Sequence, residues 1–254
     1  MDSTQDIVVS GARPGVLLIT LDRPQVRNAL RTAMLAEIAH ALDDAARDDG
    51  VRCVVLTGGA KVFAAGADIK EMAELDRVSA ARNPRFEHWD SIRRFPKPLI
   101  AAVNGYALGG GNELAMHADI VIAGADARFG QPEVNLGAVP GAGGTQRLTR
   151  IVGKPLAMKM ILAGELIDAE AALRAGLVTE VAEPERVLDR ALDLAESIAA
   201  KPPLAVRAAK EAVLAAYEMT LEAGLRFERR AYLDMFATED LAEGVRAFAE
   251  KRKP

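Results

Sequence analysis

Residues 99–144, LIAAVNGYALGGGNELAMHADIVIAGADARFGQPEVNLGAVPGAGG, form the stretch that decides the fold and holds most of the candidate chemistry. The first five residues are apolar and predict a buried strand. Three glycines at 109–111 follow, and then Asn112 and Glu113 begin a helical pattern. Glu133 comes twenty positions after Glu113, in a second loop with the sequence GQPE. A strand, a glycine turn, a helix and two carboxylates therefore occur in one short segment.

Glycines that open a helix leave backbone N–H groups without partners, because the first turn of a helix has no acceptor for them. Glycine also lets another molecule approach the backbone closely. The positive end of the helix dipole stabilises an oxygen that gains negative charge. Two carboxylates near such an oxygen would supply a general base and a general acid. We therefore expect a catalytic site built around Gly110, Glu113 and Glu133.

Each feature also has an ordinary structural interpretation. Glycines between a strand and a helix are often only turn residues. Glu113 would favour the first turn of its helix through the dipole, and Glu133 after a proline could be a solvated loop residue. Only the combination favours catalysis. A second loop of small residues at 61–68 also leads into a helix, which makes the N–H of Ala67 the natural partner of the N–H of Gly110.

The composition indicates a globular protein with an aliphatic core. The chain has 254 residues, of which 50% are hydrophobic but only 4% aromatic. This length allows one large domain, or one domain with an appendage. The formal net charge of −4 gives no support to nucleic-acid binding, for which a basic stripe is expected. The small basic cluster at 251–253 is more typical of a solvated helix end.

Disulfide and metal chemistry find no support in the sequence. The single cysteine, Cys53, lies in an apolar run and is expected to be a small buried side chain. His40, His88 and His117 are scattered without a ligand spacing, so we expect no metal site. Residues 1–10 do not resemble a signal or transit peptide, and no apolar run reaches the roughly 18 residues of a membrane span. We expect a cytoplasmic protein.

The rest of the chain predicts a mixed α/β body followed by a helical tail. A hairpin is expected from strands 7–10 and 16–21, and a mobile loop at 76–85. Further strands are predicted at 53–56, 119–123 and 178–181, and helices at 32–48, 86–94, 141–151, 154–163 and 168–175. From residue 184 the pattern is helical, at 185–200, 204–217, 221–236 and 239–251. We expect a core domain at 1–190 and a helical region at 191–254, which must pack on the body or on a neighbouring subunit.

The glycine-rich segments do not fit nucleotide-binding or nucleophile motifs. The sequence contains no G-x-x-x-x-G-K-[ST], and the order of glycines at 105–110 does not match G-x-G-x-x-G. There is no G-x-S-x-G.

Several segments together resemble the crotonase superfamily, close to enoyl-CoA hydratases. They are FAAGADIKEM at 63–72, AAVNGYALGGGNELA at 101–115, FGQPEVNLG at 129–137 and PGAGGTQRL at 140–148. The likeness extends from RPQVRNAL at 23–30 to AFAEKRK at 247–253, which is nearly the whole chain. Asn112 departs from the pattern, because many hydratases have cysteine there, and Gln25 stands where lysine is frequent. We expect neither to touch the reacting atoms.

The resemblance implies an α/β fold, a spiral of ββα units whose helical C-terminal region builds trimers, usually paired into hexamers. It implies that Glu113 and Glu133 are catalytic and that the N–H groups of Ala67 and Gly110 form an oxyanion hole. It also implies a set of residues that bind coenzyme A: Ala29, Ala65, Ala67, Asp68, Ile69, Lys70 and Gly110, with Phe248 and Lys251 reaching the CoA of a neighbouring subunit. No metal or redox cofactor is implied, since coenzyme A is part of the substrate.

The implied reaction is the reversible syn addition of water to a trans-2-enoyl-CoA, giving a 3-hydroxyacyl-CoA, in fatty acid or aromatic-acid degradation. Three alternatives remain: an enoyl-CoA isomerase, a different acyl-CoA lyase on the same scaffold, and a non-enzymatic member that binds acyl-CoA or RNA. The acyl pocket is expected to involve residues 73–95 and 134–140. Arg82 or Arg85 could meet a substrate carboxylate there, as in the dehydroadipyl-CoA hydratases of phenylacetate breakdown, which the chain also resembles. The ordinary interpretation is that both arginines are solvated.

Overall fold

The computed structural model describes residues 5–253, so the first four residues of the expected N-terminal segment lie outside it. The strands are β1 (Ile7–Arg13), β2 (Val16–Leu21), β3 (Cys53–Thr57), β4 (Leu99–Val103), β5 (Tyr106–Leu108), β6 (Ile120–Gly124), β7 (Arg128–Gly130), β8 (Ile167–Asp168) and β9 (Glu180–Ala182). The helices of the body are α1 (Thr32–Arg47), α2 (Ile69–Ala73), α3 (Arg77–Ala81), α4 (Arg85–Arg93), α5 (Gly110–His117), α6 (Gly144–Val152), α7 (Lys154–Leu162), α8 (Ala169–Arg174) and α9 (Val187–Ala199). The tail contains α10 (Pro203–Ala215), α11 (Leu221–Met235) and α12 (Glu239–Ala249), and short 3-10 turns lie at Pro24–Val26, Glu133–Leu136 and Pro184–Arg186.

Two sheets wind together as the chain advances. The larger has the order β1-β2-β3-β4-β6-β9, with β1 and β2 antiparallel and the other neighbours parallel. The smaller has the order β5-β7-β8. Two turns of the chain, β4-β5-α5 and β6-β7-α6, each add a strand to the larger sheet, then one to the smaller sheet, then a helix. The predicted α/β spiral of ββα units is thus confirmed.

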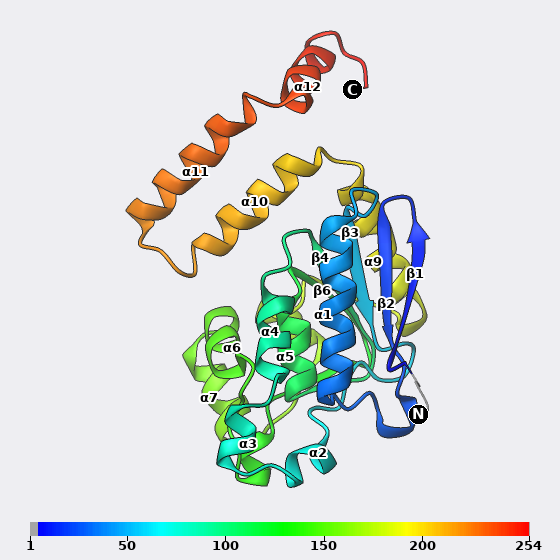
Figure 1. Ribbon diagram of the computed structural model, residues 1–254, viewed down its shortest axis with the longest axis vertical. Helices are drawn as coiled ribbons and strands as arrows, with labels where there is room; N and C mark the ends of the chain where they lie inside the picture. The colour runs from blue at the N-terminus through cyan, green and yellow to red at the C-terminus, as the bar shows by residue number, and fades with distance from the viewer. Residues whose placement is uncertain (1–4, 254) are drawn as a thin grey trace.

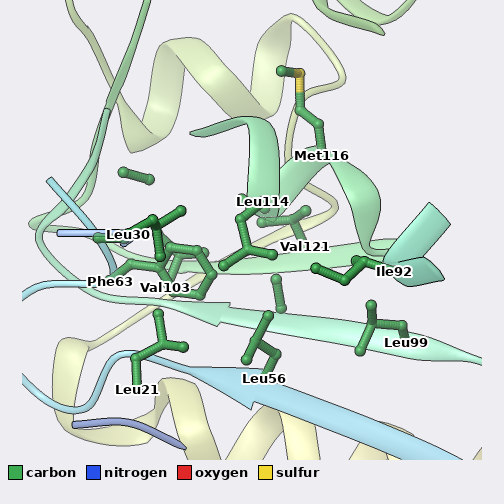
Figure 2. Packing of buried hydrophobic residues seen from close by; sticks show 14 of the residues in the cluster. Leu21, Leu30, Leu56, Phe63, Ile92, Leu99, Val103, Leu114, Met116 and Val121 are labelled. Carbon is green, nitrogen blue, oxygen red and sulfur yellow. The ribbon is translucent and has the colours of Figure 1, made fainter. Parts of the chain in front are cut away.

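Strand β4 lies at the centre of the larger sheet and is buried along its whole length. Its side chains are apolar on both faces because helices cover both sides of the sheet. On one face Leu56, Leu99 and Val103 pack with Leu114 of α5, and Figure 2 shows these residues together. On the other face, the strands pack against α9. The core is almost entirely aliphatic, as the small aromatic fraction predicts.

Most expected elements are present within a residue or two of their predicted ends. The hairpin of β1 and β2, the helix at 32–48 and the buried strand at 99–103 are confirmed. Cys53 is buried, and burial raises the pKa of its thiol to about 12. The short strands β5 and β7 were not foreseen. Along residues 5–253, no helix has the length and apolar character needed to cross a bilayer.

The segment 76–85, expected to be a mobile loop, contains a short helix, so the expectation of an irregular loop is wrong there. Helix α3 occupies the middle of that segment, and Asp76 caps it. The Asp76 carboxylate accepts a hydrogen bond from the backbone N–H of Ser79, and the Ser79 hydroxyl accepts one from the N–H of Asp76. This capping box satisfies N–H groups that would otherwise lack partners at the start of the helix. Asp-x-x-Ser at 76–79 is the signal that indicates it.

The helical tail stands away from the body. Figure 1 shows α10, α11 and α12 projecting beyond the end of the sheet, whereas α2 and α3 lie at the opposite end of the molecule. Helix α9 instead packs on β3 and β4, so the predicted boundary after residue 190 falls inside a helix of the body. The ammonium group of Lys210 joins α10 to the body by donating to the carboxylate of Asp119 at 2.8 Å.

Candidate active site

The start of α5 and the segment before α2 bring two backbone N–H groups together. Leu30 anchors the segment before α2. Its N–H donates to the carbonyl of Gly66, and its carbonyl accepts from the N–H of Asp68. A Cβ placed on Gly110 would lie 3.5 Å from the nitrogen of Ala67. Within residues 5–253, neither Ala67 N–H nor Gly110 N–H donates to a protein acceptor. The two groups are therefore free to bind an oxygen from outside the chain.

Glycine is required where α5 approaches this segment. Gly109 has φ +50°, a backbone conformation that favours glycine, and its N–H donates to the carbonyl of Gly130. A Cβ on Gly111 would overlap the carbonyl of Ala64. The two backbones thus meet without intervening side chains, and this contact sets the spacing between the N–H groups of Ala67 and Gly110.

Glu113 is buried one turn into α5, where its side chain meets the start of α6. Its Oε1 accepts hydrogen bonds from the N–H groups of Ala142 and Gly144, both at 2.7 Å. Burial raises the pKa of Glu113 above its ordinary value, while the two N–H groups, Arg85 and Arg147 oppose that rise. The N–H donors stabilise the ionised form and hold the carboxylate in one orientation.

Glu133 opens the 3-10 turn Glu133–Leu136 and has a poorer set of partners. Its Oε1 accepts one hydrogen bond, from Nε2 of Gln131 at 3.3 Å, and its Oε2 is buried without a partner. Burial, together with the negative charge of Glu113, raises the pKa of Glu133 to about 7. A carboxyl in this environment holds a proton near neutral pH and can donate it.

A cavity of about 580 Å³ is lined by Glu113 and Glu133 together with Ala67 and Gly110. Its other walls come from α2, α3, α4 and the segment 132–142. They include Leu75, Ala80, Phe86, Trp89, Leu136, Ala138 and Val139. These residues lie in the ranges 73–95 and 134–140 from which an acyl pocket is expected, and apolar side chains dominate them.

The structure gathers most of the predicted site residues, though not all of them. Ala65, Ala67, Ile69, Gly110, Glu113 and Glu133 line the cavity. Ala29, Asp68 and Lys70 lie on the adjoining segments instead. Asp68 has a structural task there, since it caps α2 and pairs with Arg23 at 3.1 Å. Phe248 and Lys251 belong to the end of the tail, which Figure 1 places far from α2 and α3 of the same chain.

A buried amide network behind Glu133 was missed in the sequence. Asn112 donates from Nδ2 to Oε1 of Gln131 at 2.9 Å, and Gln131 in turn donates to Glu133. Both amides are fully buried. Asn112 therefore reaches the site through one intermediate side chain, although it does not touch the cavity. The signal in the sequence was Asn112 itself, a polar residue directly after the glycine run at 109–111.

Comparison with known proteins gives, along nearly the whole chain, the family that the sequence motifs resemble. Residues 11–254 match the family described as enoyl-CoA hydratase/isomerase. The 2,3-dehydroadipyl-CoA hydratase of Escherichia coli K12 is 52% identical over 94% of each chain, and the mitochondrial enoyl-CoA hydratase of Pongo abelii is 49% identical over 96% of this chain and 84% of the relative. A crystal structure of an enoyl-CoA hydratase subunit from Geobacillus kaustophilus superimposes with a TM-score of 0.95 at 45% identity, covering 98% of this chain and 96% of the other. The chain belongs to the enoyl-CoA hydratase/isomerase family of the crotonase superfamily.

Proposed function

We propose that the protein is an enoyl-CoA hydratase that adds water reversibly to a trans-2-enoyl-CoA and forms a 3-hydroxyacyl-CoA. The relatives with hydratase names at about half identity support this reaction. The observation that carries the proposal is the unequal environment of two carboxylates in one cavity. Glu113 accepts two short N–H hydrogen bonds, whereas one oxygen of Glu133 has no partner. The pair is therefore divided into a base and an acid.

The thioester carbonyl binds between the N–H groups of Ala67 and Gly110. When water adds at C3, negative charge moves to the thioester oxygen as an enolate. Donors that already face that oxygen stabilise the charge without reorganising, and loss of one such donor typically costs about 3 kcal/mol. The N–H of Gly110 also lies at the positive end of α5, which adds to this stabilisation.

The two carboxylates divide the protons of the added water. Ionised Glu113 takes one proton from the water as its oxygen bonds to C3. Protonated Glu133 gives its proton to C2 as the enolate collapses. The thioester then carries a hydroxyl at C3 and a new hydrogen at C2, and the glutamates recover their starting states by exchange with solvent. This sequence needs no cofactor besides the coenzyme A of the substrate.

Crotonyl-CoA provides the first test, because hydration removes the absorbance of its conjugated thioester. We expect rapid loss of absorbance with the native protein and a fall in rate of about 10²- to 10⁴-fold in Glu113→Gln. Glutamine keeps an oxygen that can accept from Ala142 and Gly144, so the variant should fold. A native rate in Glu133→Gln would show that Glu133 is not the acid. A shift of a 3-enoyl double bond without hydration would instead identify an isomerase.

The assembly and the CoA contacts of the tail form a further part of the proposal. Helices α10–α12 expose large apolar side chains, including Val213, Leu221, Phe236 and Phe248. Packing of these faces on other subunits, in a homotrimer or homohexamer, would cover them. In such an assembly Phe248 and Lys251 of one chain would reach the CoA bound by its neighbour. Sedimentation analysis of the native protein measures the assembly, and a monomer at micromolar concentration would contradict it. The cytoplasmic location stays a prediction.

A further inference from the structure

The segment that carries Ala67 is held in place by residues 23–30, the support segment, whose side chains take no part in the proposed proton transfers. The N–H of Leu30 donates to the carbonyl of Gly66 at 2.8 Å. The N–H of Asp68 donates to the carbonyl of Leu30 at 3.1 Å. Backbone hydrogen bonds from the support segment therefore hold the residues on both sides of Ala67.

The side chain of Asn28 fastens the support segment to the loop that leads to Ala67. Asn28 is buried, and its Nδ2 donates to the carbonyls of Val62 and Phe63 at 3.1 and 3.0 Å. Its Oδ1 accepts from the backbone N–H of Arg23 at 2.9 Å. One buried amide thus connects the start of the support segment with the loop on the other side of the contact.

Arg23 connects the support segment to the residue that follows Ala67. Its Nη1 donates to the carbonyl of Ala29 at 2.6 Å and to Oδ2 of Asp68 at 3.1 Å, and its Nε lies 3.4 Å from Oδ1 of Asp6. The side chains of Arg23 and Asp68 are only 12% and 15% exposed, so solvent ions screen this pair weakly. Arg23 therefore holds the carboxylate next to the oxyanion donor from one side.

Both carboxylates that Arg23 contacts have further partners that fix them. Asp6 also binds Arg31, whose Nη2 donates to Oδ1 of Asp6 at 2.8 Å. Asp68 caps α2, because its Oδ1 accepts from the N–H of Lys70 at 3.1 Å. Burial alone would raise the pKa of Asp68, yet hydrogen bonds from Arg23 and from N–H groups of α2 lower that pKa below its ordinary value. Asp68 stays ionised, and its hydrogen bond with Arg23 is charge-assisted.

The two oxyanion donors differ in how the chain orients them. The N–H of Gly110 belongs to the first turn of α5, so the helix sets its direction. Ala67 precedes α2 and follows Gly66, which has φ +124°, a backbone conformation that favours glycine. Because no helix contains Ala67, the direction of its N–H depends on how the residues beside it are held.

We propose that Arg23 is a positioning residue for hydration, which acts through Asp68 to aim the N–H of Ala67 at the thioester oxygen. This inference rests on the proposed hydratase function and deepens its account of the oxyanion hole. Arg23 does not line the cavity and touches no reacting atom. Its ion pair with Asp68 does for Ala67 what the helix does for Gly110.

Steady-state hydration of crotonyl-CoA by Arg23→Gln provides the kinetic test. A misdirected donor stabilises the enolate less, while it changes the binding of the uncharged substrate little. We therefore expect kcat to fall about 10- to 100-fold and KM to change less than about threefold. Arg23→Lys keeps the charge and should recover part of the loss in kcat. A raised KM at the native kcat would show that Arg23 supports CoA binding instead, and would overturn the inference.

The carbonyl stretch of the bound thioester reports the oxyanion donors directly. Crotonyl-CoA with an isotope label at the thioester carbonyl can be bound to Glu113→Gln, in which hydration is slow. Hydrogen bonds from the two donors weaken the carbonyl bond and lower its infrared stretching frequency relative to free crotonyl-CoA. When Arg23→Gln is added to Glu113→Gln, that frequency should move back toward the value for free crotonyl-CoA. An unchanged frequency would contradict the positioning role.

A second variant keeps the test decisive if Arg23→Gln lowers stability. Asp68→Asn removes the charge, but asparagine can still accept from the N–H of Lys70 and cap α2. Its kcat should fall to a similar extent. The double variant Arg23→Gln/Asp68→Asn should lose no more activity than either single variant, because both changes remove the same pair. Additive losses would show that the two residues act independently, and would overturn the inference.

Arg13→Gln is the matched control. Arg13 also pairs with two carboxylates, those of Asp193 at 3.0 Å and Glu196 at 2.9 Å, but it joins β1 to α9, which lines no part of the cavity. Both kcat and the carbonyl frequency should keep their native values in this variant.

The outcomes distinguish this inference from the function on which it rests. If Arg23→Gln loses stability but keeps the native kcat and carbonyl frequency, Arg23 serves the fold alone, and the hydratase function stands. If the native protein does not hydrate crotonyl-CoA, the proposed function fails and the inference fails with it.

Discussion

The segment 99–144 and the helices α10–α12 differ in how far a single chain completes them. In the first, every residue from Gly110 to Met116 is buried, and the carboxylate of Glu113 finds its hydrogen-bond donors within the same segment. In the second, α10 and α11 contain no buried residue in the part of the chain that the structure describes, and Leu221 is 79% exposed. The backbone geometry of the site is thus determined by one chain, whereas the tail has apolar faces that need another surface.

The largest difference in activity and stability is expected between a glycine-to-alanine change in α5 and the same change in the tail. In Gly111→Ala, the new Cβ would overlap the Ala64 carbonyl, so α5 must move away from the segment that holds Ala67. We expect kcat to fall about 100-fold or more, because one oxyanion donor is displaced. The free energy of unfolding should fall by about 1–3 kcal/mol. Steady-state kinetics and denaturant titration measure the two effects.

Gly224→Ala in α11 is the matched control. A Cβ at Gly224 meets no atom within 4 Å, and alanine favours a helix over glycine by about 0.5–1 kcal/mol. Unchanged kinetics and equal or greater stability are therefore expected there. If Gly111→Ala behaved like Gly224→Ala, the close backbone contact would not determine the oxyanion geometry.

The second prediction concerns the pH dependence of the site. Glu133 has a pKa raised to about 7, and it must be protonated to act as the acid. Activity is therefore present below pH 7 and should fall about tenfold per pH unit above it. At low pH, protonation of Glu113 should remove the base, at a pH above the ordinary carboxyl range. The profile of kcat/KM against pH reports these values for the coupled pair.

Glu133→Gln provides the check on that assignment. Its residual activity should lack the decline above pH 7, because no proton is lost from glutamine. A native profile that stays flat between pH 6 and 9 would contradict the proposed division between acid and base. Variants of the tail, which lies far from both glutamates within the chain, should leave the pH of half-maximal activity unchanged.

Local chemistry explains which parts of the site the sequence could predict. Gly110 and Glu113 lie in the first turn of a single helix, and the apolar run at 99–103 predicts the strand that precedes it. The donors to Glu113 could not be found this way, because Ala142 and Gly144 come from a turn 29 and 31 residues further on. Only the packing of α6 against α5 brings them to the carboxylate.

Other features depend on details that a sequence pattern does not resolve. Strands β5 and β7 have three residues each, too few to show an alternation of polar and apolar side chains. Of Arg82 and Arg85, only Arg85 lines the cavity, and the sequence pattern did not distinguish the two. The tail was predicted as helical from its period, but the period does not say which surface covers its apolar face.

The third prediction tests the exposed face of the tail. Leu221→Asp places a charge on a surface that we propose is buried between subunits. Loss of one buried leucine weakens an interface by about 1.5–3 kcal/mol, so the concentration needed for assembly should rise about tenfold or more. Light scattering across a dilution series measures this. Val9→Asp on the exposed face of β1 is the control. An equal effect of that variant would show that the apolar face of the tail does not form the subunit interface.

The smallest effect is expected from Asn112, which lies behind the site. Replacement by alanine leaves Oε1 of Gln131 without its donor in a buried position, which typically costs about 1–3 kcal/mol of stability. Gln131 then holds Glu133 less firmly, so we expect kcat to fall only about three- to fivefold, because Glu133 itself remains. The weaker hold on Gln131 also weakens the hydrogen bond from its Nε2 to the carboxylate of Glu133, so the pKa of Glu133 should rise and the decline in activity should move to higher pH. Asn104→Ala removes a similar buried amide that bonds Pro184 outside the site, and it should lower stability without moving the pH profile. If both variants left the profile unchanged, Asn112 would serve the fold alone. The difference between the segment 99–144 and the tail would then be due to the backbone of α5 and not to the buried amides of Asn112 and Gln131.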